Sequence, residues 1–218
     1  MAQYFLKITD RWIWSYNSQI TDGADWANYF QWFHITSNGA LKVGEGYTMK
    51  GTGGYAPIDE TQNYVFIGKP NSGTIALSMT PNNSYLIGNP YPSALDADEF
   101  IKDNLKDCLG CRSTVNSFSG ALYFWDHFEL SNNHTLAEYE GGYATYTLMG
   151  GVAAINNSPL NLNDGAIGSI TPKRYIPVGQ GFFIDGYIDF EVVGAQIPTV
   201  VQGGSILFKN NRPLDMVL

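Results

Sequence analysis

The sequence is poor in charged residues. Of its 218 residues, 15% are charged, which is well below the roughly one quarter usual in globular proteins. Acidic residues outnumber basic ones by 20 to 12, and the net charge is −8. Such a surface repels phosphate backbones and anionic lipid headgroups, so neither nucleic acid nor an anionic membrane is an expected partner. No apolar stretch approaches the ~18 residues of a membrane-spanning helix, so membrane insertion is not expected either.

Cysteine is scarce as well. Cys108 and Cys111 stand in a C-x-x-C pattern, which occurs in redox pairs, zinc sites and small disulfides. A zinc site needs two further ligands, and there is no second cysteine pair. A redox pair usually opens a helix beside a βαβ unit, which this sequence does not indicate. If the protein is exported, the pattern favours a local disulfide that pins a surface loop.

Signatures of common catalytic sites are missing. The sequence contains no G-x-S-x-G and no H-E-x-x-H, and its cysteines lack a recognisable Cys/His arrangement. Asp126 and Glu138 could serve glycoside hydrolysis at the right separation, but nothing in the sequence selects that pair. We therefore expect a non-catalytic protein, with a polysaccharide-acting hydrolase as an alternative.

Glycine and aromatic residues are plentiful, at 24 glycines and 14% aromatics. Short runs rich in aromatic and β-branched residues recur between Gly, Pro, Asn and Asp, which is typical of strands. These runs are 11–16, 28–35, 46–50, 63–68, 74–79, 85–88, 121–128, 143–149, 181–193 and 205–209. The pattern predicts an all-β antiparallel sandwich, for which a jelly roll is one arrangement. The sandwich module is expected over residues 41–218, and the strands of residues 1–40 belong to it or form a separate hairpin.

One segment departs from the strand pattern. In "NPYPSALDADEFIKDNLKDC", Ser93 is placed to cap a helix over about residues 94–105, with acidic residues in its first turn. The segment before the helix, "NPYP" at residues 89–92, turns a corner between a strand and the helix, and this corner has two interpretations. Tyr91 is either a stacking platform on a loop or a side chain packed inside a proline-stiffened turn. In the first case Asp96, Asp98 and Glu99 contact a sugar or Ca²⁺, and in the second they serve the helix N-terminus.

Two further groups of residues are candidate sites. Exposed aromatic side chains bind sugar rings by stacking, and Trp125 is a candidate for this role. Trp12 and Trp14 are two more, since they share one face if residues 11–16 are extended. The alternative is that these rings pack in the core. No cofactor is expected beyond Ca²⁺.

A histidine-containing stretch follows Trp125. Asp126, His127 and His134 flank an Asn-rich turn, where a hairpin could bring them together as ligands of a metal ion. Their spacing is looser than that of a true metal motif. The alternative is that the histidines cap strand ends.

The chain also contains an internal echo. Residues 41–51 read "LKVGEGYTMKG" and residues 176–186 read "IPVGQGFFIDG", so V-G-x-G-aromatic occurs twice. Neither copy is a phosphate loop, because no Gly-Lys-Ser/Thr and no helix follows. Each copy predicts a tight turn in which glycine adopts a positive φ and feeds a strand.

A set of collinear motifs resembles a known kind of module. The motifs are "LKVGEGYTMKGTG", "QNYVFIGKPNSGTIAL", "LIGNPYPSALDADEFI", "LYFWDHF", "YEGGYATY", "RYIPVGQGFF" and "SILFKNNR". Together they resemble a β-rich region of large secreted Bacteroidetes proteins that lies just before a type IX secretion sorting domain. The resemblance implies an extracellular or cell-surface location, export by type IX secretion, and neighbouring domains in a longer precursor.

The expected function follows from the resemblance and the aromatic residues together. We expect a non-catalytic module of an exported surface protein that acts in adhesion or glycan binding. A structural spacer that presents a neighbouring domain is the main alternative. The spacer predicts buried aromatic side chains, whereas the binding module predicts exposed ones.

Overall fold

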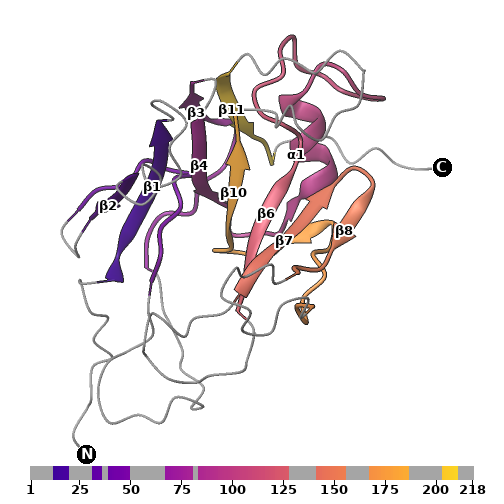
Figure 1. Cartoon of the computed structure of the whole chain (residues 1–218). Coiled ribbons are helices and arrows are strands. Elements are labelled where there is room, and N and C mark those ends of the chain that lie inside the picture. The colour runs from indigo at the N-terminus through magenta and orange to yellow at the C-terminus, as the bar shows by residue number, and fades with distance from the viewer. Residues whose placement is uncertain are drawn as a thin grey trace, which may run out of the picture.

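The computed structural model describes eight ranges of the chain. They are residues 12–19, 31–35, 39–49, 67–80, 83–127, 141–155, 167–186 and 203–210. Within them lie eleven strands and one helix (Figure 1). The elements are β1 (Trp14–Gln19), β2 (Trp32–His34), β3 (Ile75–Met79), β4 (Asn83–Gly88), β5 (Leu95–Asp96), α1 (Ala97–Asn104), β6 (Leu122–His127), β7 (Gly141–Thr147), β8 (Gly150–Val152), β9 (Tyr175–Ile176), β10 (Gly181–Asp185) and β11 (Gly204–Phe208). No helix in these ranges is long and apolar enough to cross a membrane.

Seven strands form one large antiparallel sheet in the order β2-β1-β4-β10-β6-β7-β8. Strand β4 lies between β1 and β10, with Asn17 opposite Tyr85 on one side and Phe183 opposite Leu86 on the other. The strands from the first 40 residues are therefore hydrogen-bonded into the same sheet as the later ones. In the centre of the sheet, the neighbouring pairs β1–β4, β4–β10 and β10–β6 each join segments that are far apart in the sequence.

A smaller layer covers one face of the large sheet. It consists of the antiparallel pair β3–β11 and of α1. Phe100 of α1 joins the layers, because its ring lies 5.7 Å from that of Phe182 in β10 and 5.1 Å from that of Phe208 in β11. All three rings are buried in one core together with Phe118. The expected all-β sandwich with one short helix is thus confirmed, and the helix shares the second layer with two strands.

The helix begins later than the sequence predicts. Asp96, not Ser93, is its N-cap, and the Asp96 side chain accepts a hydrogen bond from the backbone N–H of Glu99 at 3.3 Å. Arg174 holds Asp96 in place through bonds of 3.0 and 2.8 Å from its guanidinium. Ser93 instead offers its carbonyl oxygen to the side chain of Asn89 at 2.8 Å. Asp96 with Glu99 three residues later is itself a local cap signal, and the prediction chose Ser93 instead.

The loop after the helix is tied back to it. Cys108 and Cys111 form a disulfide, and Arg112 follows directly. The Arg112 guanidinium binds the buried carboxylate of Asp103 at 2.7 Å and the carboxylate of Glu99 at 2.9 Å. The backbone N–H of Arg112 also donates to the carbonyl of Lys102 in the last turn. This last bond satisfies one of the carbonyl groups that a helix C-terminus leaves open.

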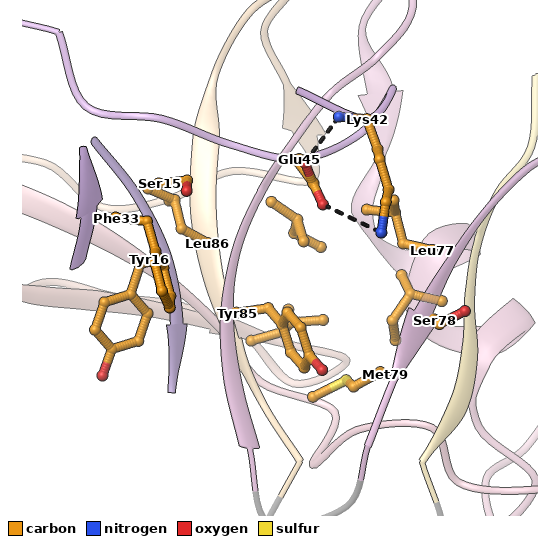
Figure 2. Close-up of a pocket in the computed structure, with 13 residues that line it drawn as sticks. Ser15, Tyr16, Phe33, Lys42, Glu45, Leu77, Ser78, Met79, Tyr85 and Leu86 are labelled. Carbon is orange, nitrogen blue, oxygen red and sulfur yellow. Dashed lines mark hydrogen bonds and ion pairs between the residues drawn. The ribbon is translucent and has the colours of Figure 1, made fainter. Parts of the chain in front are cut away.

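A partly open cavity of about 150 Å³ lies between the two layers (Figure 2). Leu77 and Met79 of the small sheet line it, as do Tyr85 and Ile184 of the large sheet. Its charged lining residues, Lys42 and Glu45, bind one another: the backbone N–H of Lys42 donates to the Glu45 carboxylate at 2.7 Å. Since most of the lining is core side chain, the cavity is a gap in packing rather than a polar binding site.

Candidate functional site

The large sheet has two chemically different faces. Strand residues alternate between faces, so Phe182 and Ile184 of β10 point into the core while Phe183 and Asp185 lie on the outer face. Residues paired across neighbouring strands share a face, and Phe183 pairs with Tyr123. The outer face is the one that β3, β11 and α1 do not cover.

A continuous row of aromatic rings crosses this outer face. We call the following five side chains, taken from five strands, the aromatic row: Trp32, Tyr16, Phe183, Tyr143 and Trp125. Successive ring centroids are 4.8, 5.3, 5.5 and 5.1 Å apart. The rings meet mainly edge to face, which is a favoured geometry for aromatic pairs.

One end of the aromatic row is open to solvent. Trp125 is 50% exposed and Tyr143 is 45% exposed, whereas the other three members are less accessible. Gly141 lies opposite His127 in the register, and a Cβ at this position would collide with the indole of Trp125. The missing side chain therefore lets the indole lie against β7.

Polar groups sit beside the rings. The Ser84 hydroxyl donates to the carboxylate of Asp185 at 2.5 Å, and the Tyr123 hydroxyl also bonds to it. Burial raises the pKa of Asp185 above its ordinary value, and these two hydrogen bonds oppose the shift. Burial also raises the pKa of Tyr143 to about 12, with Tyr16 and Asp185 acting in the same direction. The Tyr143 hydroxyl thus remains a hydrogen-bond donor into the alkaline range.

The three tryptophans predicted as ligand-binding residues have different places. Trp125 is in the aromatic row. Trp14 lies on the same outer face, with its ring 4.7 Å from that of His34. Trp12 precedes β1, which begins at Trp14, so the expectation that both belong to one extended strand is wrong. The carbonyl of Trp12 accepts a bond of 3.0 Å from the hydroxyl of Thr48.

Tyr91 is not on the surface. Its side chain is 2% exposed, and its hydroxyl donates to the carbonyl of Gly73 at 2.6 Å. Asn89, two residues earlier, accepts from the N–H of Tyr91 and donates to the carbonyls of Ser93 and Pro177. Tyr91 therefore packs inside the corner, and it cannot stack on a ligand as the first interpretation required.

The acidic residues after the corner bind protein groups. Asp96 pairs with Arg174, and Asp98 accepts from the hydroxyl of Tyr146 at 2.8 Å. Glu99 pairs with Arg112 at 2.9 Å. These carboxylates hold the helix to the rest of the fold, in line with the second interpretation of this segment.

The candidate metal ligands do not converge in the described part of the chain. Asp126 and His127 are neighbours in β6, so their side chains point to opposite faces. Asp126 is buried and accepts a bond of 3.1 Å from the N–H of Ile170. His134 and Glu138 lie outside the described residues. No group of three or more potential ligands occurs among the residues that are described.

The sequence did not single out Phe183, Tyr143 or Asp185. The alternation in "GFFIDG" and "GGYATYT" was visible, and it could have assigned each residue to one of two faces. It could not tell which strands are neighbours. The aromatic row exists because β10 lies between β4 and β6, and no local signal encodes that order.

Comparison with known proteins gives a family but no activity. Neither the curated proteins nor the solved structures include a significant match. Residues 2–193, most of the chain, match a family that is described as a domain of unknown function, DUF8693. The chain therefore belongs to the DUF8693 family.

Proposed function

We propose that this chain is a non-catalytic module that binds glycans through the aromatic row. The observation that carries the proposal is the row itself: five rings in serial contact on the face of the large sheet that the described elements β3, β11 and α1 leave free. Large aromatic side chains usually lie in a core, whereas here Trp125 and Tyr143 are about half exposed. Aromatic surfaces of this kind are typical of binding sites.

The chemistry of the outer face suits sugars. Aromatic rings offer apolar faces to the C–H surfaces of a pyranose, and neighbouring polar groups bond its hydroxyls. Asp185, Ser84 and Tyr123 form such a polar group next to Phe183. A ligand that is apolar on its ring faces and polar at its rim matches this combination.

The proposal includes export to the cell surface or medium. Disulfides persist mainly in oxidising compartments, and the Cys108–Cys111 bond supports such a location. The resemblance to secreted Bacteroidetes modules supports type IX secretion and neighbouring domains in a longer precursor. In that setting a glycan-binding module acts in adhesion or holds a protein on a polysaccharide surface.

A glycan array tests the proposal with one matched pair of variants. Trp125→Ala removes an exposed ring of the aromatic row, and Tyr175→Ala removes a ring that is 62% exposed but lies in β9, outside the large sheet. We expect the native chain to bind at least one class of glycan, Trp125→Ala to lose that signal, and Tyr175→Ala to keep it. Absence of binding to every glycan, or equal loss in both variants, would contradict the proposal.

The spacer remains the second candidate, favoured by one observation. Edge-to-face contacts within the aromatic row are stabilising in themselves, at about 0.5–1.5 kcal/mol per pair. A row that serves only to stiffen the sheet predicts that Trp125→Ala lowers stability without any ligand being found. The array and an unfolding measurement on the same variant separate the two functions.

A further inference from the structure

A groove lies where β4 ends at Gly88 and β10 begins at Gly181. The groove is open, has a volume of about 750 Å³ and is lined by the "VGEGY", "IGKPN", "GNPYP" and "VGQG" segments. Gly46, Gly88 and Gly181 lie side by side on three adjacent chain segments, and we call them the glycine strip. A Cβ built on Gly88 would lie 3.8 Å from the Cα of Gly181 and 4.0 Å from that of Gly46.

The two echoed motifs meet in this groove from opposite sides of β4. The N–H of Gly88 donates to the carbonyl of Gly44 in "VGEG" at 2.9 Å, and the N–H of Asn89 donates to the carbonyl of Gln180 in "VGQG" at 3.1 Å. The first glycine of each motif has a positive φ, 94° at Gly44 and 72° at Gly179, as the sequence predicted. The echo is therefore a pair of turns that flank one strand end.

Packing explains only part of the glycine strip. At Gly46, a Cβ would approach the carbonyl oxygen of Ile87 to 2.8 Å, so glycine is required there. At Gly88 and Gly181, the nearest atoms would be 3.6 and 3.5 Å away, which is ordinary contact, and neither residue has a positive φ. The fold tolerates side chains at these two positions, and their absence keeps the groove open.

The floor of the groove cannot accept an added β-strand. Gly46 donates to the carbonyl of Leu86 at 3.0 Å, while Gly88 pairs with Gly181 on the other side. Strand β4 is thus flanked on both sides, and peptide binding by strand addition needs a free edge. A ligand has to lie face-on over the bare backbone, between walls that include Tyr47 and Val178.

The glycine strip continues the aromatic row. Gly181 lies two residues before Phe183 on the same face of β10, a separation of about 7 Å along a strand. We propose that the aromatic row and the groove form one site for an extended, uncharged glycan chain, in which some sugar units stack on rings and others lie over the glycine strip. This inference rests on the proposed glycan-binding function and adds the ligand's length and charge.

The charges of the site favour an uncharged ligand. The groove is lined by one residue of each sign, Lys69 and Glu45, and Asp185 lies beside the aromatic row. The chain as a whole carries −8. The groove thus offers no excess of positive charge to attract an anionic polysaccharide, and the net charge of the chain disfavours one, whereas neither acts against an uncharged polysaccharide.

Titration calorimetry on the whole chain tests the inference. The probes are galactomannan, xyloglucan and dextran as uncharged polymers, a trisaccharide from each, and alginate as the anionic polymer. Gly88→Leu and Gly181→Val fill the groove, Gly88→Ala is the matched small substitution, and thermal unfolding checks that each variant folds. We expect Gly88→Leu and Gly181→Val to weaken binding of the preferred polymer by about tenfold or more while trisaccharide binding stays unchanged. Gly88→Ala should have a much smaller effect.

The outcomes separate the two proposals. If both filling variants fold and bind the polymer as the native chain does, while Trp125→Ala abolishes binding, the groove is not part of the site and the glycan-binding function stands. Tighter binding of alginate than of every uncharged polymer would overturn the assigned ligand charge. If the native chain binds none of the probes and no glycan on the array, both proposals fail.

Discussion

The two faces of the large sheet use aromatic residues for different ends. On the inner face, Phe182 is 1% exposed and contacts Phe100 and Phe124 at centroid distances of 5.7 and 5.6 Å. On the outer face, its neighbour Phe183 stands in a row that ends at solvent-exposed Trp125. These inner rings are phenylalanines, and the two tyrosines of the same face, Tyr146 and Tyr85, have their hydroxyls bonded to the protein groups Asp98 and Asn83. The outer row is dominated by Tyr and Trp, whose polar groups need a partner or water.

The largest expected difference between the two faces is in stability, and it is tested by truncating the adjacent residues Phe182 and Phe183. Phe182→Ala should lower the free energy of unfolding by about 3–5 kcal/mol, because it empties a closed core site. Phe183→Ala should lower the free energy of unfolding by only about 1–2 kcal/mol, because folding buries less apolar surface at this half-buried position than at Phe182. Denaturant unfolding measures both. Equal losses would mean that the outer face is as closed as the inner one.

The inner face also depends on a polar clamp. Buried Asn104 donates to the carbonyl of Leu207 at 2.9 Å and accepts from its N–H at 2.7 Å, which fixes α1 to β11. Asn104→Ala leaves both backbone groups of Leu207 without this partner, so the free energy of unfolding should fall by about 2–3 kcal/mol. Glycan binding at the outer face should not change in calorimetry. A loss of binding without a loss of stability would contradict the separation of the faces.

Tyr91 provides a smaller test of the same separation. Tyr91→Phe removes the hydrogen bond to Gly73 and keeps the ring, so stability should fall by about 1 kcal/mol. The affinity for any glycan should stay at the native value, since the side chain is buried. Chemical denaturation and calorimetry check the two parts. A large loss of affinity at native stability would return Tyr91 to the binding residues.

The smallest effect concerns pH. Because the pKa of Asp185 is raised, the folded chain holds this proton at pH values where the unfolded chain has released it. The free energy of unfolding should therefore fall as pH rises from the ordinary carboxyl pKa through the raised one. Asp185→Asn removes this contribution and should flatten the profile.

Ser84→Ala gives the complementary result. The Ser84 hydrogen bond lowers the pKa of Asp185, so its removal should extend the window to higher pH. Unfolding curves collected across the acidic and neutral range measure both variants. An unchanged profile in Asp185→Asn would show that this carboxyl titrates in the same way in both states.

The sequence predicted what depends on neighbouring residues. Runs such as "ALYFWDHF" and "GFFIDG" became β6 and β10, and the positive φ of the V-G-x-G turns followed from glycine chemistry. The helix was placed but its start was not: Asp96 with Glu99 three residues later marks the cap locally, and the prediction chose Ser93.

What depends on distant pairing could not be predicted. Trp125 was a candidate because tryptophan commonly serves in sugar sites, but its neighbours in the aromatic row come from four other strands. The strand order brings Gly88 beside Gly181 and Phe183 beside Tyr123. A periodic pattern assigns a residue to a face and leaves open which other residues share it.

The most direct test of the account asks where a glycan touches the protein. Hydroxyl-radical footprinting with mass spectrometry reports the accessibility of individual aromatic side chains, with and without galactomannan, xyloglucan or dextran. We predict that at least one of these polymers protects Trp125 and Tyr143 and leaves Tyr175 unprotected. Protection of Tyr175 without Trp125, or no protection by any of them, would contradict the claim that the aromatic row is the binding surface.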